Sequence, residues 1–591
     1  MTIFAARCLA IAIVCHAAIA VSQSTGRPNI LVILADDQGW GDLSMHGNPN
    51  VSTPNIDRLA ASGVTLQNFY VCPVCAPTRA EFLTGRYHPR GGVRGVSRGR
   101  ERMSGDEVTL AELLREDGYA TAAYGKWHNG TQWPSHPNAQ GFDDFYGFCS
   151  GHWGNYFSPM LEHNGRIIHG NGYLPDDLTD HAIEFIAADS SKPFFVYLPL
   201  NTPHSPMQVP DRWFTPKRSL EPVPDPAAEN ARDERIDMTR AALAMVENID
   251  WNVGRLLTAL QDNHQLDNTI IVYFSDNGPN SARFNGGMRG RKGSVHEGGV
   301  RSPCIVQHTG TIPAGVDCHS VAGAIDLMPT LLHMADVDPP ADRVIDGINL
   351  ADELIDQSNQ IDPSRTLVTH WNNKLSVRSG RYRYHENGRL YDIGNDRGEH
   401  HDVAAANLEV VRRLSNVLAE YRQQVRPASR DKDTRPFVVN YPGCSSTQLP
   451  ARDCHTRGNA RHSNRHRNCT YIENWTSTTD SLTWPVEVAQ PGPQRAILYY
   501  CAKRQNLGSV IELSCGEASL TRTIDQPNPS EISGRQRDRV PRIEGYVKDF
   551  QPLDMGIIDL PSGVADLTLR ATKVVGEEVA EVRLLMLLPP E

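Results

Sequence analysis

Continuous apolar runs alternate with helical patterns over the first two-thirds of the chain. Residues 29–35 (NILVILA) are all apolar after the first position, which is typical of a strand buried on both faces. Similar runs occur at residues 65–71, 120–124, 193–198 and 269–274. Between the last two, apolar residues recur at helical spacing from Met238 to Leu260. Strands that alternate with helices predict an α/β fold with a mostly parallel central sheet flanked by helices, here over residues 27–364.

The pattern changes near residue 365. Short strand-like runs predict a small antiparallel sheet; they occupy residues 366–371, 375–378, 382–384 and 390–391. A helical pattern over residues 407–425 follows, so we expect a C-terminal subdomain at residues 365–427 that this helix closes. The polar stretch ASRDKDTRP then indicates a linker. Beyond the linker, apolar and polar residues alternate in runs such as DLTLRA (residues 566–571). These runs predict an appended β-sandwich at residues 437–591.

The first 22 residues are typical of a secretory signal peptide. One arginine precedes a short apolar run, and small residues follow it. The run is too short for a confident membrane span, although an uncleaved anchor helix is the alternative. Val14 stands before Cys15 where a lipoprotein site needs a small residue. We therefore expect an exported protein, periplasmic or secreted, without stable membrane insertion.

Chain length indicates several structural units, and net charge argues against nucleic acid as a binding partner. The chain has 591 residues, too many for one ordinary core, so several structural units are expected. Its net charge of −11 gives no reason to expect nucleic acid as a partner.

Cysteines crowd the last quarter of the chain. Of the twelve cysteines, five lie there: Cys444, Cys454, Cys469, Cys501 and Cys515. In an exported chain this crowding predicts disulfides. The segment 452–469 between two of these cysteines is rich in Arg and His. We interpret it as a disulfide-bounded basic loop able to attract an anionic polysaccharide, with a zinc site as the alternative. Aromatic residues of this region could stack on sugars, but core packing is favoured for Trp475, Trp484, Tyr499 and Tyr500.

Polar residues with oxygen-bearing side chains follow two of the predicted strands. Asp36 and Asp37 come directly after the run NILVILA, and Asp276 and Asn277 follow the strand at residues 269–274. The carboxyl ends of parallel strands meet at one edge of a sheet, so these side chains are expected to lie together. Three carboxylates and one amide suit a hard cation such as Ca²⁺ or Mg²⁺. The alternative is ordinary turn chemistry after a strand.

The segment Cys75-Ala-Pro-Thr-Arg79, continuing to Thr-Gly-Arg86, carries the strongest signal. It closely resembles the Cys-x-Pro-x-Arg signature of the formylglycine-dependent sulfatases, members of the alkaline-phosphatase-like superfamily. The resemblance extends over residues 27–425. The alternative is a structural cysteine in a proline turn.

The resemblance implies that a maturation enzyme oxidises Cys75 to the aldehyde formylglycine. One hydroxyl of the hydrated aldehyde would attack sulfur and expel the alcohol; deprotonation of the second would then release sulfate. It also implies that residue 75 joins Asp36, Asp37, Asp276 and Asn277 as metal ligands, with Ca²⁺ preferred to Mg²⁺. Arg79 would steady both the formylglycine and the metal site.

Further basic residues match the family by position. In Gly-Lys126-Trp-His128, Lys126 would bind sulfate and His128 would be the base that releases it. His204 would hold the ester oxygen or protonate the leaving group. Lys292 would be the second sulfate contact and a rival general acid. Fixed cations of this kind are what charge developing on sulfate requires.

Four more charged residues are interpreted as supporting ones. Glu297 and Arg301, in Glu-Gly-Gly-Val-Arg, are expected around the site or in a structural role. Asp326 and Asp346 are expected to be structural.

The sequence therefore predicts a metal-dependent hydrolase of sulfate esters. Aryl sulfates are the expected artificial substrates and a sulfated carbohydrate the natural one. Two alternatives remain: a phosphodiester or phosphonate monoester hydrolase of the same superfamily, and an inactive protein that binds sulfated glycans. Lys126, His128 and Lys292 favour sulfate, and the filled catalytic positions argue against an inactive protein.

Overall fold

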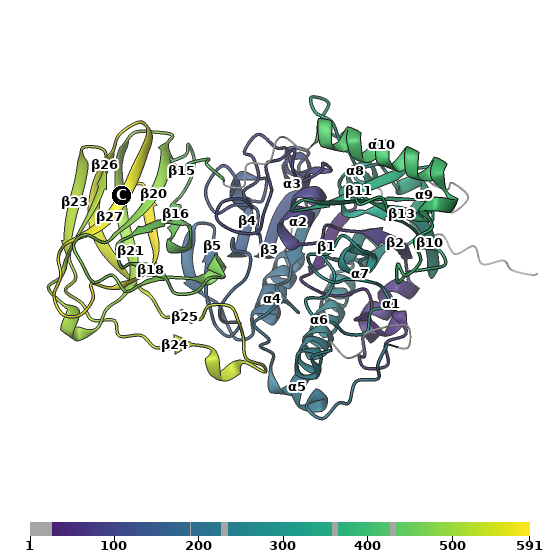
Figure 1. Cartoon of the computed structure of the whole chain (residues 1–591), viewed down its shortest axis with the longest axis horizontal. Coiled ribbons are helices and arrows are strands. Elements are labelled where there is room, and N and C mark those ends of the chain that lie inside the picture. The colour runs from purple at the N-terminus through teal and green to yellow at the C-terminus, as the bar shows by residue number, and fades with distance from the viewer. Residues whose placement is uncertain (1–25, 189–190, 226–233, 357–363, 426–432, 591) are drawn as a thin grey trace, which may run out of the picture.

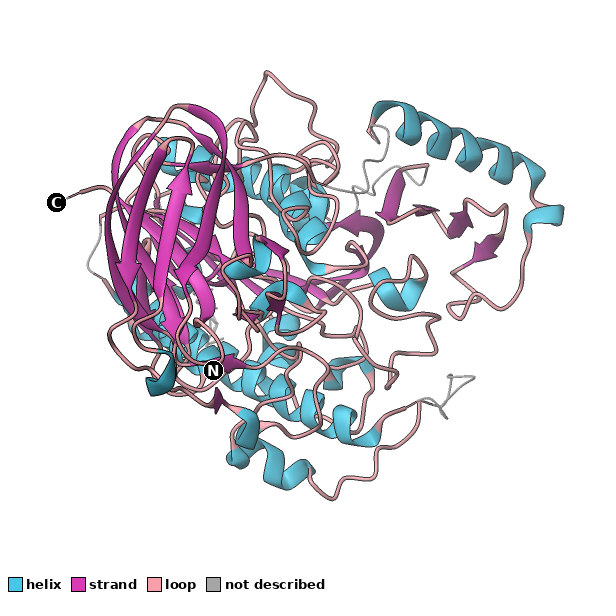
Figure 2. Cartoon of the chain, turned by 60° about the vertical axis from the view of Figure 1, so that its left-hand side comes forward, coloured by secondary structure: helices cyan, strands magenta, loops and turns pink. Residues whose placement is uncertain are grey.

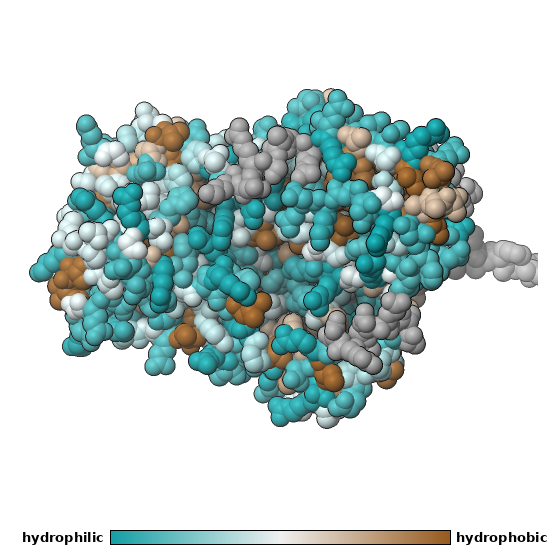
Figure 3. Space-filling view, viewed as in Figure 1, coloured by the Kyte–Doolittle hydropathy of each residue, from teal (hydrophilic) through white to brown (hydrophobic). Residues whose placement is uncertain are grey.

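A computed structural model of the chain describes five stretches: residues 26–188, 191–225, 234–356, 364–425 and 433–590. The predicted signal peptide lies outside them. A larger α/β part and a smaller β part lie side by side (Figure 1). Within the described stretches, every helix is too short or too polar to cross a membrane. The face of the molecule drawn in Figure 3 is largely hydrophilic over both parts, with scattered hydrophobic groups.

A ten-stranded sheet forms the centre of the α/β part. Its spatial order is β10 (Val316–Gly323), β2 (Val64–Tyr70), β9 (Cys304–Gln307), β8 (Thr269–Ser275), β1 (Asn29–Ala35), β7 (Phe194–Pro199), β3 (Ala120–Lys126), β4 (Asp144–Phe148), β5 (Met160–His163) and β6 (Arg166–His169). The five strands from β8 to β4 are mutually parallel, whereas β9, β5 and β6 run antiparallel to their neighbours. The predicted mostly parallel sheet is confirmed.

Helices cover both faces of this sheet (Figure 1). They are α1 (Pro54–Ala61), α2 (Cys75–Thr84), α3 (Leu110–Glu116), α4 (Leu174–Ala187), α5 (Asp211–Lys217), α6 (Ile236–Asp262), α7 (Glu297–Val300), α8 (Leu327–Met334) and α9 (Ala351–Ile355). Side chains alternate along β1: Ile30 and Val32 pack with α2, α3 and α8, while Leu31 and Ile33 pack with α4 and α6. Helix α6 confirms the helix predicted from Met238 onward.

A four-stranded antiparallel sheet follows. It consists of β11 (Thr366–Trp371), β12 (Lys374–Ser379), β13 (Tyr382–His385) and β14 (Leu390–Asp392). Helix α10 (Leu408–Gln424) packs Leu414 and Leu418 against Val377 of this sheet. The predicted antiparallel sheet with a closing helix is therefore present.

Two six-stranded sheets form the β-sandwich at the C-terminal end (Figure 2). One contains β15 (Phe437–Val439), β17 (His455–Arg457), β20 (Ser481–Val488), β22 (Val510–Cys515), β23 (Ala518–Thr523) and β27 (Gly563–Lys573). The other contains β16 (Thr447–Pro450), β18 (Arg461–His462), β19 (Ile472–Glu473), β21 (Gly492–Cys501), β26 (Gln551–Leu560) and β28 (Glu581–Leu588). Both line one core, in which Trp475, Trp484 and Tyr500 are buried, as predicted. Tyr499, for which core packing was also predicted, is half-buried and packs outside this core.

The prediction of disulfides in this region is wrong. All ten described cysteines are unpaired and buried. Cys454 and Cys515 pack inside the sandwich core, where a thiol behaves as a small apolar group. Among the described residues, the side-chain clusters that could hold a metal include neither Cys454 nor Cys469, so the zinc alternative gains no support.

An arm at residues 532–548, which includes β24 (Ile532–Ser533) and β25 (Val547–Lys548), leaves the sandwich and lies along the α/β part (Figure 1). The Gln208 side chain donates to Asp538 at 2.8 Å, and the Arg539 amide donates to the Met207 carbonyl at 2.9 Å. The arm therefore contacts the chain just beyond the carboxyl end of β7.

Candidate active site

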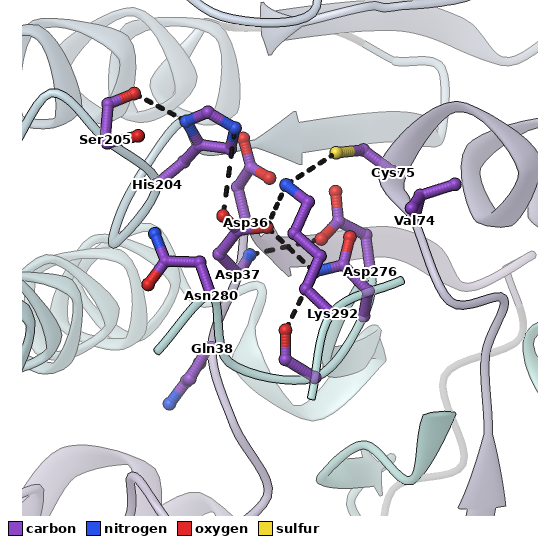
Figure 4. A network of polar contacts seen from close by, with 12 residues as sticks. Asp36, Asp37, Gln38, Val74, Cys75, His204, Ser205, Asp276, Asn280 and Lys292 are labelled. Carbon is purple, nitrogen blue, oxygen red and sulfur yellow. Dashed lines mark hydrogen bonds and ion pairs between the residues drawn. The ribbon is translucent and has the colours of Figure 1, made fainter. Parts of the chain in front are cut away.

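The carboxylates predicted to meet at the sheet edge do so. Ala35 of β1 pairs with Ser275 of β8, which places the residues after these two strands side by side. The Asp37 amide donates to Asp276 Oδ1 at 3.2 Å, and Asn277 Nδ2 donates to Asp37 Oδ1 at 2.8 Å (Figure 4). Asp36, Asp37, Asp276 and Asn277 are all buried.

Three buried oxygens of this group lack a hydrogen-bond partner among the described residues: Asp36 Oδ1, Asp37 Oδ2 and Asn277 Oδ1. A buried polar atom without a partner is costly, so three together indicate a missing ligand. Metal-ligating atoms of Asp36, Asp37, Cys75 and His204 lie within 4.8 Å of one another. Oxygen-rich sets of this kind fit a hard cation such as Ca²⁺ or Mg²⁺.

Cys75 is the first residue of α2, so it lies at the positive end of the helix dipole. Its side chain points toward Lys292, whose Nζ is 3.5 Å from Sγ (Figure 4). Burial raises the pKa of the Cys75 thiol to about 12. Cysteines that act directly as nucleophiles have lowered pKa values, so the unmodified thiol is poorly suited to that task.

Buried cations balance the carboxylates. Lys126 Nζ lies 2.5 Å from Asp36 Oδ2, and Arg79 binds Asp276 Oδ2 at 2.8 Å. Lys292 forms an ion pair with Asp37. All three cations were predicted as site residues, and the structure brings them together around residue 75.

The electrostatic environment shifts the pKa values of Asp37 and Asp276 in opposite directions. Burial opposes ionisation of Asp37, but Lys292 and His204 hold its pKa below the usual range. Burial and the charge of Asp36 instead raise the pKa of Asp276 to about 6.

The two predicted histidines occupy different positions. His204 Nε2 lies 3.7 Å from Asp37 Oδ2, and its Nδ1 donates to the Ser205 carbonyl at 2.5 Å (Figure 4). Burial, followed by Lys292, lowers the pKa of His204 to about 4. His128 is buried, and its Nε2 bonds the Val96 carbonyl at 2.9 Å rather than Cys75. Burial and Lys126 lower the pKa of His128 well below its usual value.

Two site residues have an uncommon backbone conformation. Asp37 and His128 have φ values of 67° and 64°, in the left-handed region that side chains other than glycine rarely adopt. Such conformations concentrate at functional sites, where the surrounding structure enforces them.

His152 is a site residue that the sequence did not reveal. Its ring is stacked 5.9 Å from that of His204, and its buried Nε2 lacks a partner among the described residues. It follows β4, whose carboxyl end lies at the same sheet edge as that of β3. The strand-end rule would have found it, but β4 was not among the predicted strands.

A cavity of about 690 Å³ opens over the site. Asp37, His152, His204 and Lys292 line its catalytic side. Residues from the sandwich and its arm line the other side; they are Arg465, His466, Arg467, Asn468, Val540, Pro541, Arg542, Ile543 and Glu544. The basic segment noted in the sequence therefore lies at the cavity, although no disulfide bounds it.

Glu297 and Arg301 are bonded away from the cavity. Glu297 binds Arg383 at 2.7 Å and Arg301 at 3.5 Å, which joins α7 to the antiparallel sheet. These contacts agree with a structural role for both residues.

Asp326 and Asp346 also have structural contacts, as expected. Asp326 accepts from the Gly323 amide at 2.8 Å, and Asp346 pairs with Arg90 at 2.8 Å.

A buried, charge-dense site thus lies at the carboxyl ends of the central strands, where enzymes with open α/β sheets bind their ligands. A family model described as Sulfatase matches residues 28–337. The chain belongs to the sulfatase family and is a sulfuric ester hydrolase, which confirms the family predicted from Cys75 and its neighbours. The phosphodiester alternative is correspondingly disfavoured.

Three similar proteins illustrate this membership. N-acetylgalactosamine-6-sulfatase of Canis lupus familiaris is 33% identical, over 61% of this chain and 71% of its own length. Human arylsulfatase A is 30% identical, over 74% of this chain and 97% of its own. The crystal structure of Ps i-CgsB in complex with k-i-k-neocarrahexaose superposes with a TM-score of 0.62 and 30% identity, covering 69% of this chain and 96% of that one.

Proposed function

We propose that this chain is an exported sulfatase that removes sulfate from a sulfated carbohydrate, using formylglycine made from Cys75 and a bound Ca²⁺. The observation that carries the proposal is the set of unpartnered oxygens on Asp36, Asp37 and Asn277, buried beside Cys75. Neither a thiol nor the surrounding lysines satisfies those oxygens, whereas a hard cation does.

Similar proteins support a carbohydrate substrate. The canine relative is named for N-acetylgalactosamine, and Ps i-CgsB was crystallised with k-i-k-neocarrahexaose. A cavity of about 690 Å³ is of the size that commonly holds a ligand larger than a sulfate ion.

The side chains of the site divide the chemistry between them. The hydrated aldehyde and the bound cation together supply an activated hydroxyl and polarise the sulfate oxygens. Lys126 and Lys292 bind sulfate, and Lys292 also reaches residue 75. They stabilise the charge that develops on the sulfate oxygens.

Proton transfer falls to the two histidines. Nδ1 of His204 donates to the Ser205 carbonyl, so Nε2 faces the site and exchanges a proton with the leaving oxygen. Nε2 of His128 donates to the Val96 carbonyl, which leaves its buried Nδ1 as the atom that accepts a proton.

Three measurements test the proposal. Mass spectrometry of the peptide that contains Cys75 should show the mass loss of conversion to formylglycine when the chain is coexpressed with a maturation enzyme. Sulfate release from sulfated oligosaccharides should rise in proportion to the converted fraction.

Cys75→Ser should still bind these oligosaccharides but lose at least about 10³-fold in turnover, because serine forms a sulfate ester with no route to release. Full turnover by that variant would exclude the aldehyde mechanism. Full turnover by wild-type protein whose Cys75 has not been converted to formylglycine would exclude it as well.

A further inference from the structure

Seven arginines line the cavity over the candidate active site, and four of them come from two distant parts of the chain. Arg98 and Arg100 belong to the loop that follows α2, and Arg465 and Arg467 belong to the sandwich. We call these four residues the arginine wall. They line the same cavity as Asp37, His204 and Lys292.

Among the described residues, no carboxylate lies within ion-pair distance of the arginine wall, although the charge of Asp453 partly offsets the lowering of the Arg467 pKa. None of its four members forms an ion pair with a carboxylate of the described residues. Within the described stretches, the hydrogen bonds of the Arg465 and Arg467 guanidinium groups go to the imidazoles of His466 and His462, at 3.1 and 3.2 Å. Arg100 has a buried Nε without a partner among the described residues. Arg98 and Arg465 are exposed and Arg100 and Arg467 are half-buried, whereas most buried arginines of the described residues, such as Arg79, are paired with carboxylates.

Carboxylates at the cavity are already bonded elsewhere. Two acidic residues line it, Asp37 and Glu544. Asp37 pairs with Lys292, and Glu544 accepts from the Ser205 hydroxyl. The positive charge of the arginine wall is therefore not neutralised from within the cavity.

Members of the wall repel one another. Burial and then the charge of Arg98 lower the pKa of Arg467, although one residue comes from the α/β part and the other from the sandwich. An anion between the two guanidinium groups would replace this repulsion with attraction. The planar guanidinium fork matches the oxygens of a sulfate or a carboxylate.

The wall is held at a fixed position relative to the site. The Ser150 hydroxyl donates to the Asn468 carbonyl at 2.6 Å, next to Arg467 in the chain. A Cβ placed on Gly151 would lie 2.4 Å from both Asn468 Nδ2 and His128 Nε2. Asn468 and the proposed base thus pack against the same glycine, so the sandwich segment and the catalytic residues share one rigid support.

We propose that the arginine wall is a second anion subsite, which binds a further sulfate or carboxylate group on the same glycan whose sulfate ester is cleaved. The substrate class is accordingly a multiply anionic glycan, and the sandwich takes part in its recognition. This inference rests on the proposed function, because it assigns one anionic group to the site at Lys126 and Lys292 and another to the wall.

Binding to the full-length Cys75→Ala protein, which has no nucleophile at residue 75, tests the subsite without turnover. The probes are three matched disaccharides: one with a single sulfate, one with a second sulfate on the neighbouring sugar, and one with a carboxylate there. Calorimetry should give a Kd at least about tenfold lower for either doubly charged probe, and their ratio shows which group the wall prefers. Adding Arg98→Ala or Arg467→Ala should abolish the advantage. Arg461→Ala is the matched control, because this exposed arginine of the same segment pairs with Glu473 and lies off the cavity.

The outcomes separate the subsite from the reaction. Equal affinity for all three probes, or an advantage that survives in both Arg98→Ala and Arg467→Ala, would overturn the subsite. If thermal unfolding shows that Arg467→Ala does not fold, Arg98→Ala, in the α/β part, decides. Absence of sulfate release by the formylglycine-bearing wild type would instead overturn the proposed function, whatever the binding data give.

Discussion

At the scale of single residues, Asp276 serves two neighbours at once. Its Oδ2 accepts from Arg79 at 2.8 Å, and its Oδ1 accepts from the Asp37 amide at 3.2 Å. It therefore positions a proposed ligand and a cation together.

Asp276→Ala should release the bound metal and reduce kcat/KM by at least about 10²-fold, the size of loss typical when an electrostatic group of an active site is removed. Metal content by mass spectrometry and sulfate release measure the two effects. Asp554→Ala, at an exposed ion pair of the sandwich, should leave both unchanged. Normal activity of Asp276→Ala after exhaustive chelation would rule out the metal role.

Glu81 gives stability a dependence on pH. This residue of α2 is buried, and burial raises its pKa to about 8 from 4.5. The folded state thus binds the proton more tightly than the unfolded state. Stability from this group is complete below pH 4.5 and is lost as pH rises through 8, by up to about 1.4 kcal/mol per pH unit.

Glu81→Gln should remove this slope, because glutamine stays neutral while its carbonyl can still accept from the His88 amide. Urea unfolding at pH 5 and pH 8 gives the free energies of unfolding. The stability of the variant relative to the wild type should increase as the pH rises. An equal dependence of the free energy of unfolding on pH in the two proteins would contradict the raised pKa of Glu81.

Sequence reasoning identified site residues wherever a strong local pattern existed. Asp36, Asp37 and Asp276 follow apolar strands, and Cys75 lies in a specific motif, so all four could be placed beforehand. His152 could not, because its strand is short and its neighbours carry no motif. The cysteines were misjudged for a physical reason: their number suggests pairing, but pairing depends on Cβ positions that only the fold defines.

At the scale of elements, one buried carboxylate joins a short helix to a separate sheet. Glu297 begins α7, and its Oε1 accepts from Arg383 of β13 at 2.7 and 2.9 Å. Its Oε2 accepts from the Tyr70 hydroxyl at the end of β2. Three elements therefore depend on one side chain.

Glu297→Gln should lower the free energy of unfolding by about 3–5 kcal/mol, because it leaves the buried guanidinium of Arg383 without its counter-charge. Arg381→Gln, which breaks an exposed pair with Asp392, should cost less than about 1 kcal/mol. Similar losses in the two variants, measured by urea unfolding, would refute the difference in burial as the cause.

Helices and strands with a long, unbroken hydrophobic pattern could be predicted from the sequence, whereas short strands at the edge of the sheet could not. The strands β1 and β8 and the helix α6 bury most of their side chains, so their patterns are unbroken. The strands β5 and β6 extend the sheet at its edge and mix polar with apolar residues, so tertiary pairing rather than pattern defines them. The arm at residues 532–548 has little regular structure and could not be placed from sequence at all.

At the scale of the whole molecule, Arg452 links the sandwich to the α/β part. It is buried, donates to Thr131 Oγ1 at 3.0 Å and lies 3.7 Å from Glu101. It also hydrogen-bonds the Ser150 hydroxyl, which in turn holds the Asn468 carbonyl.

Arg452→Ala should destabilise the protein by about 3–5 kcal/mol, because Glu101 and Asp453 would remain buried without their counter-charge. It should also speed proteolysis between the two parts, which gel electrophoresis over time would follow. Arg570→Ala removes an exposed pair on the sandwich and should alter neither rate nor stability. Unchanged proteolysis of Arg452→Ala would show that other contacts suffice.

The position of the strand β28 in its sheet has a consequence for folding of the protein. β28 pairs with β16, β19 and β21, so it lies inside the sheet although it follows every other strand of the described residues in the sequence. The cavity wall at residues 465–468 directly precedes β19, and β19 is held by β28. We therefore expect the proposed anion subsite to become fixed only after β28 has paired with β19, which is later than the folding of the α/β part that carries the catalytic residues.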